Sequence, residues 1–303
     1  MKVLATRRFP GAAWDELRDV EIAGPDGLAT PRDDVDALAV ANETVGAPEL
    51  DLLPNLRLVA NYGVGYDRVD VEECARRGVA VTNTPGVLDA ATADLAFGLL
   101  MAVRREIVVA DRFVRSAGWS GSWSEGGLAE ELSDSTLGIV GLGRIGSAVA
   151  RRARGFDLRV LYTSRTPKDT DLGDRRELDD LLRESDIVTL HVPRSGETER
   201  LIDARRLALL RNGATFVNTA RGELVDEEAL VRELVSGRID AGLDVFAHEP
   251  HVPPELLELP NVVLTPHIGS ATVTARRAMT RLVVDNLLAF ERGGPLVTPV
   301  AKA

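Results

Sequence analysis

A chain of 303 residues is long enough for one large domain or for two domains of ordinary size. Its 36 basic and 47 acidic residues give a net charge of −11, which argues against nucleic acid or an anionic membrane as a partner, because both require a basic surface. The single cysteine, Cys74, excludes an intrachain disulfide and argues against a thiolate metal cluster. We therefore predict no metal site and a reducing, cytoplasmic setting. We also expect neither export nor membrane insertion, because no long apolar run follows Met1 and no stretch reaches roughly 18 apolar residues.

The first part of the chain has the pattern of a small parallel α/β unit. Short apolar runs predict strands at 2–6, 35–40, 57–62 and 79–82. Residues 69–77 are predicted to be helical, and the mostly apolar run 88–104 predicts a long helix that crosses into a second domain. Residues 116–134 are rich in Gly and Ser and predict a surface connection.

The second domain is predicted to alternate strands and helices. Its predicted strands are 137–140, 158–163, 186–192, 214–218, 239–245 and 262–265. Helical patterns at 177–184, 204–210 and 226–236 join them, so we expect a doubly wound parallel sheet. A long helix over 271–292 cannot add a strand and is expected to return to the first domain. The expected domains are therefore 1–87 with 271–303, and 88–270.

The stretch 136–151, TLGIVGLGRIGSAVAR, joins a predicted strand to a predicted helix through three glycines. Gly141, Gly143 and Gly146 form the pattern G-x-G-x-x-G. In dinucleotide-binding units these glycines permit the tight turn, let the backbone approach the pyrophosphate, and let helix and strand pack closely. The helix N-terminus adds unpaired N–H groups and a partial positive charge. Glycine-rich turns occur in other α/β proteins, but the flanking strand and helix favour dinucleotide binding here.

The end of the next predicted strand, LYTSRTPK, carries the pattern that bears on cofactor choice. NAD-binding units place Asp or Glu about 20 residues beyond the glycines, where it binds the ribose hydroxyls. Here Ser164, Arg165 and Thr166 stand at that place, and Arg165 follows Gly141 by 24 residues. An arginine between two hydroxyls suits a 2′-phosphate, so we predict NADP(H) in preference to NAD(H). The alternative is a solvated surface arginine.

Three ionisable residues follow three successive predicted strands, at the sheet edge where such folds bind ligands. They are Arg221 in VNTARGELVDE, Glu249 in GLDVFAHEP and His267 in LTPHIGSAT. Each residue alone has a structural explanation: a helix cap or ion pair for Arg221, a solvated acid for Glu249, a structural histidine for His267. Their joint placement beside a predicted nicotinamide site favours a catalytic role.

Motifs are distributed over nearly the whole chain. They are VANYGVGYDRVDVEECARRGVAVTNTPGVL, ATADLAFGLLMAVRR, TLGIVGLGRIG, TARGELVDEEAL, GLDVFAHEP and NVVLTPHIGSAT. In this order they resemble the D-isomer-specific 2-hydroxyacid dehydrogenase family, and most closely its glyoxylate and hydroxypyruvate reductase branch. The resemblance implies a doubly wound parallel-sheet (Rossmann) domain for the dinucleotide and a smaller flavodoxin-like α/β domain for the substrate. It also implies a homodimer that reduces a small 2-oxo acid to the D-2-hydroxy acid.

The same resemblance implies a role for individual residues. It implies that His267 is the proton donor and that Glu249 is the acid paired with it. It also implies that Arg221 binds the substrate's carboxylate and keto oxygen, and that the backbone of Val64 and Gly65 binds the same carboxylate. The implied cofactor contacts are Gly141, Leu142, Gly143, Arg144, Ile145, Gly146, Ser164, Arg165, Thr166, Val192, Pro193, Thr219, Ala220, Asp244, His267 and Gly269. In the reductase branch the 116–134 region can place an aromatic residue near the partner subunit's substrate, and the resemblance makes Trp123 a candidate for this role.

The chemistry of the reaction agrees with these roles. Reduction of a 2-oxo acid needs a hydride on the carbonyl carbon and a proton on the developing alkoxide, which a histidine can supply. A neighbouring carboxylate favours the imidazolium, and an arginine provides the positive charge that an acidic protein otherwise lacks.

Two alternatives remain open at the level of the sequence. A bulkier 2-oxo acid or phosphite could be the substrate of a related dehydrogenase. From another class, a dinucleotide-sensing interaction protein of corepressor type also resembles this family and keeps the three residues; the lack of a basic surface disfavours it.

Overall fold

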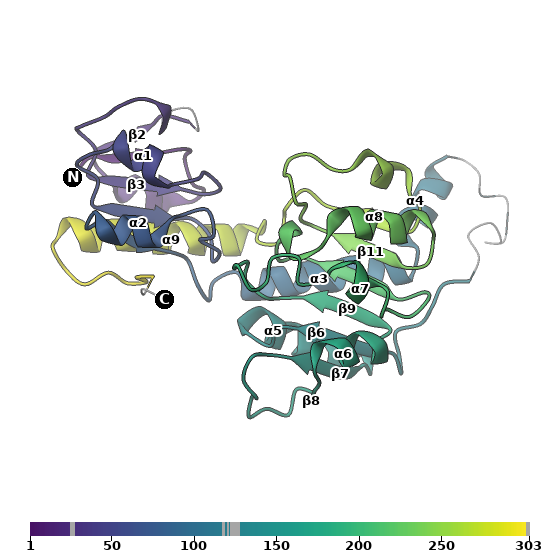
Figure 1. The fold of residues 1–303 in the computed structure, drawn as a ribbon. Coiled ribbons are helices and arrows are strands. Elements are labelled where there is room, and N and C mark those ends of the chain that lie inside the picture. Colours follow the sequence, from purple (N-terminus) through teal and green to yellow (C-terminus); the bar gives the residue numbers. More distant parts are fainter. Residues whose placement is uncertain (25–27, 117–118, 120, 122–127, 301–303) are drawn as a thin grey trace. The chain divides into compact units, whose positions relative to one another are not determined.

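The computed structural model describes residues 1–24, 28–116, 119, 121 and 128–300. The chain folds as two compact units, Met1–Leu88 with Ser270–Ala303 as unit 1 and Asp89–Gly269 as unit 2 (Figure 1). No helix in the part of the chain that the structure describes is long and apolar enough to cross a membrane.

Unit 1 is a parallel sheet with helices packed against it. Its strands are β1 (Val3–Ala5), β2 (Val20–Ile22), β3 (Ala37–Val40), β4 (Leu58–Asn61) and β5 (Ala80–Thr82), in the order β2-β1-β3-β4-β5. Its helices are η1 (Ala12–Glu16), α1 (Ala47–Asp51), α2 (Val71–Arg76) and α9 (Val273–Glu291). β3 and β4 are buried along their whole length, as expected for apolar strands covered on both faces. α9 begins at the N-cap Thr272, which accepts from the Ala275 N–H, and packs against β4 and η1.

Unit 2 is built on a second parallel sheet. Its strands are β6 (Thr136–Val140), β7 (Arg159–Thr163), β8 (Asp174–Arg175), β9 (Ile187–Leu190), β10 (Thr215–Asn218), β11 (Asp240–Leu243) and β12 (Val262–Leu264). Its helices are α3 (Asp89–Arg104), α4 (Ile107–Arg115), α5 (Arg144–Ala153), η3 (Arg154–Phe156), α6 (Leu178–Glu184), α7 (Ala204–Leu207), η4 (Gly222–Leu224), α8 (Glu227–Val235) and η5 (Pro254–Glu258). The strand order is β12-β11-β10-β9-β6-β7-β8, so the chain changes direction across the sheet between β6 and β9.

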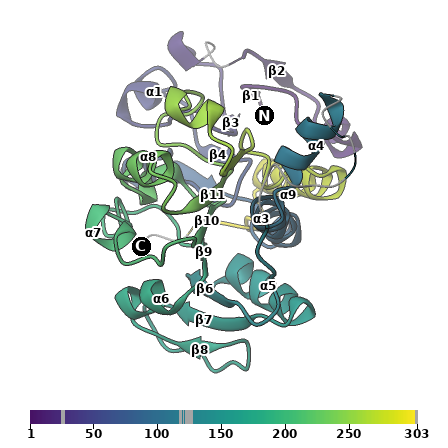
Figure 2. The same cartoon turned by 90° about the vertical axis from the view of Figure 1, so that its right-hand side faces the viewer.

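Helices cover both faces of this sheet, and each face has its own core. Figure 2 shows α3 and α5 on one side of the strands and α6, α7 and α8 on the other. The first core includes Phe97, Leu100, Val149 and Ala153, and the second includes Leu181, Leu207, Leu230 and Leu234. The apolar residues of these helices therefore face the sheet, and the central strands β6 and β9 are buried along their whole length.

The predicted fold class is confirmed, because both sheets are parallel α/β sheets, but the sequence did not predict every element, and two strands and the helix α4 are among those that it missed. β2 is a short strand of partly exposed residues, and β8 has two charged, exposed residues, so neither produces an apolar run. The helix α4, of which no residue is buried, was also not predicted. Among the described residues, unit 1 thus has five strands instead of four, and the sheet of unit 2 has seven instead of six.

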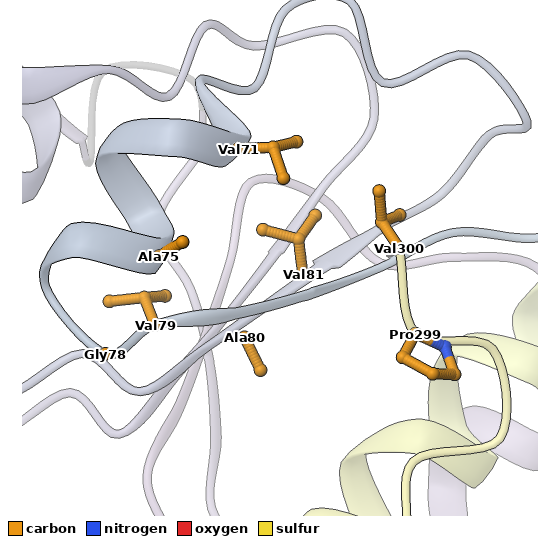
Figure 3. Close-up of a pocket in the computed structure, with 8 residues that line it drawn as sticks. All are labelled: Val71, Ala75, Gly78, Val79, Ala80, Val81, Pro299 and Val300. Atoms are coloured by element: carbon orange, nitrogen blue, oxygen red, sulfur yellow. The ribbon is translucent and has the colours of Figure 1, made fainter. Parts of the chain in front are cut away.

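Unit 1 also carries an apolar groove between α2, β5 and the residues that follow α9 (Figure 3). Its lining consists of Val71, Ala75, Gly78, Val79, Ala80, Val81, Pro299 and Val300. None of these side chains is polar, so the groove offers no group for proton transfer and no charge for an anionic substrate.

The glycine turn of unit 2 has the close packing that its pattern predicts. Gly141 has φ +99°, a conformation that other L-residues rarely adopt. A Cβ on Gly146 would overlap the carbonyl oxygen of Gly141, whereas a Cβ on Gly143 would meet nothing within 4 Å. The outer two glycines are therefore required by the turn and by the packing of α5, and the middle one leaves open space above the backbone.

We expect Gly146→Ala to destabilise the protein, because its methyl group would overlap backbone atoms rather than a movable side chain. Overpacking costs about 1–3 kcal/mol, which exceeds the helix-propensity gain of up to about 1 kcal/mol. Urea unfolding followed by circular dichroism would measure the loss. Gly155→Ala is the control, since a Cβ at Gly155 meets nothing within 4 Å; equal midpoints for the two variants would contradict the packing argument.

Candidate active site

The candidate site lies at the carboxyl edge of the sheet in unit 2. β10, β11 and β12 are parallel neighbours, so their carboxyl ends lie along one edge. Arg221 stands three residues beyond the end of β10, and His267 three residues beyond the end of β12. Asp244 follows β11 directly.

His267 and Glu249 form a hydrogen-bonded pair. The His267 Nδ1 lies 2.8 Å from the Glu249 Oε2, and the two side chains are 38% and 24% exposed. The Phe246 N–H donates to the other carboxylate oxygen at 3.3 Å. Burial acts to raise the pKa of Glu249, but the hydrogen bond and charge of His267, with smaller contributions from Phe246 and Arg221, hold it below its ordinary value. The pair thus presents an ionised carboxylate to one ring nitrogen and leaves Nε2 for another partner.

The buried carboxylate of Asp244 holds the loop that carries His267. Its Oδ1 accepts from the Thr265 hydroxyl at 2.6 Å and from the Ile268 N–H at 2.8 Å, and its Oδ2 accepts from the Gly269 N–H at 2.8 Å. The His267 N–H donates to the Asp244 carbonyl at 2.9 Å, and His267 itself has φ +53°. Burial raises the pKa of Asp244 although these donors act to lower it. The loop geometry of His267 therefore depends on Asp244.

Arg221 lies on a tight turn that is closed by Asn218. The Asn218 side chain donates to the Arg221 carbonyl at 2.8 Å and accepts from the Ala220 N–H at 3.0 Å. The next residue, Gly222, packs so closely on the backbone of Phe246 that a Cβ there would overlap it. This contact brings the turn of Arg221 against the segment that leads from Asp244 to Glu249.

The glycine turn and the ends of β9 and β10 form a surface that fits a dinucleotide. α5 begins at Arg144 after its N-cap Gly143, and no side chain caps this N-terminus. A Cβ on Gly141 would lie 2.6 Å from the His191 carbonyl oxygen and 2.7 Å from the Val192 side chain, so the turn and the end of β9 are in contact. The buried Oγ1 of Thr219 has no hydrogen-bond partner among the described residues. Uncapped N–H groups, open space above Gly143 and an unpartnered hydroxyl are compatible with a bound pyrophosphate and nicotinamide.

The remaining predicted cofactor residues are distributed along the same edge. Leu142 is buried in the turn and Ile145 lies in the first turn of α5. Pro193 is exposed beyond the end of β9, and Ala220 is half-buried beyond the end of β10. A Cβ on Gly269 would lie 3.3 Å from the Asp244 Oδ2, which leaves little room for a side chain there.

The turn after β7 carries exposed donors. The Ser164 hydroxyl donates to the Thr166 carbonyl at 2.7 Å, and Arg165 is exposed and makes no hydrogen bond or ion pair with a described residue. Arg175 of β8 donates to the Ser164 carbonyl at 3.3 Å and pairs with Glu177 at 3.1 Å. The turn thus combines Arg165 with a second guanidinium that sequence spacing did not indicate.

Two further predictions concern other parts of the chain. Val64 and Gly65 lie in unit 1, on the turn that follows β4. Trp123 lies outside the described residues.

His191, which the sequence did not single out, lies directly after β9 at the same edge. Its ring nitrogen Nε2 lies 3.0 Å from the Thr189 hydroxyl, and burial lowers its pKa to about 3, so the imidazole is neutral at pH 7. The sequence signal for His191 was its position at the end of a predicted strand. No acidic residue stands beside it in the sequence to mark it as a candidate for proton transfer.

Comparison with known proteins places this geometry in a family. The profile of the D-isomer specific 2-hydroxyacid dehydrogenase NAD binding domain matches residues 97–269. The chain is 48% identical over 316 residues to a glyoxylate reductase of Pyrococcus horikoshii, covering 96% of this chain and 93% of that protein. The chain belongs to the D-isomer specific 2-hydroxyacid dehydrogenase family. The resemblance in its motifs is thereby confirmed.

Solved structures agree with this assignment over the full length. The TT0316 protein of Thermus thermophilus superposes with a TM-score of 0.94 at 43% identity, covering 99% of this chain and 100% of that one. An NADPH-dependent glyoxylate/hydroxypyruvate reductase of Sinorhizobium meliloti, solved with NADP and malonate, superposes with a TM-score of 0.92 at 38% identity, covering 99% and 96%. Family membership supports a nicotinamide dinucleotide as the cofactor of this chain.

Proposed function

We propose that this protein reduces glyoxylate and hydroxypyruvate to the corresponding 2-hydroxy acids with NADPH, and that His267 is the proton donor. The observation that carries the proposal is the 2.8 Å contact between His267 Nδ1 and Glu249 on the sheet edge that also bears the glycine turn. Relatives support the substrate class: the Pyrococcus horikoshii protein is named a glyoxylate reductase, and the Sinorhizobium meliloti protein a glyoxylate/hydroxypyruvate reductase.

The chain's own residues account for the polar part of the reaction. Arg221 carries a permanent positive charge and binds the substrate's carboxylate and keto oxygen, which orients the carbonyl. The carboxylate of Glu249 holds the imidazole through Nδ1, so Nε2 donates its proton to the alkoxide oxygen as it forms. The nicotinamide, when bound, supplies the hydride. Asp244 keeps His267 in place through the 265–269 loop.

The two units divide these tasks in the proposal. Unit 2 binds the dinucleotide: α5 and the glycine turn take the pyrophosphate, and residues Val192, Pro193, Thr219, Ala220 and Gly269 line the nicotinamide side. Unit 1 contributes the backbone of Val64 and Gly65 to the substrate's carboxylate.

A preference for NADPH is proposed from the turn after β7. Its exposed donors include Arg165, which makes no ion pair or hydrogen bond with any described residue, and the guanidinium of Arg175 donates to the carbonyl of the neighbouring Ser164. No carboxylate stands at the position where NAD-binding units bind the ribose hydroxyls. The turn therefore suits a 2′-phosphate.

We also propose that the protein is a cytoplasmic homodimer in which α4 contributes to the interface. None of the nine residues of this helix is buried. Ile107 and Val114 are 50% and 54% exposed, and Leu128, beyond the helix, is 97% exposed. Ile107 and Val114 are seven residues apart and share a face of the helix, and exposed apolar residues on one face favour contact with a second copy, as the family resemblance implies.

The first test compares initial rates with NADPH and NADH for glyoxylate and for hydroxypyruvate. We expect the parent to favour NADPH, and Arg165→Leu to lose about tenfold to hundredfold of that preference, because a charged hydrogen bond contributes about 1.5–3 kcal/mol. Arg183→Leu, which removes an exposed arginine of α6, is the control. An NADH preference in the parent would refute the proposed role of Arg165 but would leave the proposed reductase activity standing. No turnover with either acid would refute the proposed function.

Glu249→Gln tests the support of the proton donor. The ionised carboxylate of Glu249 is hydrogen-bonded to His267 Nδ1, so without its charge we expect the alkaline limb of the rate of reduction to move to lower pH. The pH dependence of kcat/KM for glyoxylate would measure this shift. Glu255→Gln, an exposed acid of η5, should leave the profile unchanged. An unaltered profile in Glu249→Gln would remove Glu249 from the mechanism.

Val114→Glu tests the interface. A charge on the exposed face of α4 should convert a dimer to a monomer with little loss of stability, since Val114 is 54% exposed. Sedimentation velocity would report the change in mass, and Val235→Glu, at 55% exposure on α8, is the control. A parent protein that sediments as a monomer would contradict the proposal.

A further inference from the structure

Residues 63–65 form a turn after β4, and each of its three carbonyl oxygens accepts a hydrogen bond from an asparagine side-chain amide. The Asn61 side-chain amide donates to the Gly63 carbonyl at 3.1 Å and to the Gly65 carbonyl at 2.9 Å. The Asn83 side-chain amide donates to the Val64 carbonyl at 2.8 Å. The backbone N–H of residue 84 adds a second donor to Gly63 at 2.9 Å. Every partner is a carbonyl oxygen, so the amide nitrogens of both asparagines must face the turn.

These bonds determine where the backbone N–H groups point. In a planar trans peptide the carbonyl of one residue and the N–H of the next point in opposite directions. The Gly63 carbonyl faces Asn61, so the Val64 N–H faces away from Asn61; the Val64 carbonyl faces Asn83, so the Gly65 N–H faces away from Asn83. In the part of the chain that the structure describes, neither N–H donates a hydrogen bond. Both N–H groups are therefore available to an acceptor from outside the described chain, such as the oxygen of an anion.

Both asparagines are themselves firmly held. Asn61 is the last residue of β4 and is 4% exposed. Asn83 follows β5, and its backbone carbonyl accepts from the Thr298 hydroxyl at 2.6 Å. Tyr62, between Asn61 and the turn, stacks on Phe9 with ring centroids 4.2 Å apart. The donors therefore occupy defined positions before any ligand binds.

We propose that Asn61 and Asn83 are positioning residues for substrate: they hold the carbonyls of the 63–65 turn and thereby present the Val64 and Gly65 N–H groups to the carboxylate of a 2-oxo acid. The inference rests on the proposed function for the identity of the ligand. Both side chains are neutral, so they orient the peptide groups without adding a charge. A carboxylate bound in this way is bound alike in the ground state and in the transition state, so the effect falls on KM rather than on kcat.

The experiment uses variants that remove the side-chain donors. Asn83→Ala deletes the amide without adding charge, and Asn61→Asp keeps the shape of the buried residue but replaces the donor with an oxygen. KM and kcat for glyoxylate at saturating NADPH, KM for NADPH, and the urea midpoint are measured for each. Asn55→Ala and Asn55→Asp are the matched controls, because Asn55 of unit 1 also donates its amide to a backbone carbonyl, that of Asp33, at 2.6 Å.

We expect KM for glyoxylate to rise at least about tenfold in both variants, with kcat within about threefold and KM for NADPH unchanged. The Asn55 variants should behave as the parent. A fall in kcat with unchanged KM for glyoxylate, or an equal rise in KM for NADPH, would overturn the proposal, because a merely structural role would produce no selective effect on the 2-oxo acid.

A binding measurement tests the role of the two asparagines without requiring that the protein reduces a 2-oxo acid. If the parent reduces no 2-oxo acid, the proposed function fails, and oxalate is then titrated into the NADPH-loaded parent and variants by calorimetry. Oxalate binding that weakens at least about tenfold in Asn83→Ala and is unaltered in Asn55→Ala would support the role of the turn. Equal affinities, or no oxalate binding to the parent, would overturn it.

Discussion

The parallel pairing of the strands in unit 2 is the constraint on which the candidate site depends. Because β6, β7, β9, β10, β11 and β12 run in one direction, their carboxyl ends lie along one edge. Strands covered by helices on both faces carry apolar side chains, so polar chemistry is confined to the residues just beyond their ends. Gly141, Arg221 and His267 are far apart in the chain and share this edge for that reason.

Electrostatics at this edge are arranged by local groups rather than by the charge of the whole protein. The net charge of −11 would repel an anionic substrate, so attraction must come from individual donors such as Arg221. Asp244 shows how a buried carboxylate can be accommodated, since three donors surround it. Burial destabilises the charged form of Asp244 more than these donors stabilise it, so the pKa of its carboxyl group is raised. Glu249 differs because its partner, His267, can itself carry a positive charge.

Much of the fold and of the site could be predicted from local patterns. Apolar runs located the buried strands, and the glycine spacing located the turn before α5. β8 could not be predicted, because a strand of two charged residues has no apolar pattern, and its pairing with β7 depends on the neighbouring strand. Because Arg175 lies in β8, the sequence analysis also did not identify its contact with the turn after β7. Asp244 was predicted as a cofactor contact, and its hydrogen bonds to the 265–269 loop became visible only in the structure.

The sequence by itself determined the fold class, the family, the glycine turn and the three ionisable residues after successive strands, because each of these depends on residue type at a fixed local spacing. Only the tertiary structure decided which atoms meet. It places His267 Nδ1 against Glu249, and it makes the Asp244 carboxylate the acceptor for the loop of His267. It also shows that the side-chain amides of Asn61 and Asn83 donate to the carbonyls of the 63–65 turn. Hydrogen-bond partners from separate strand ends are brought together by sheet register and loop path, which no local pattern specifies.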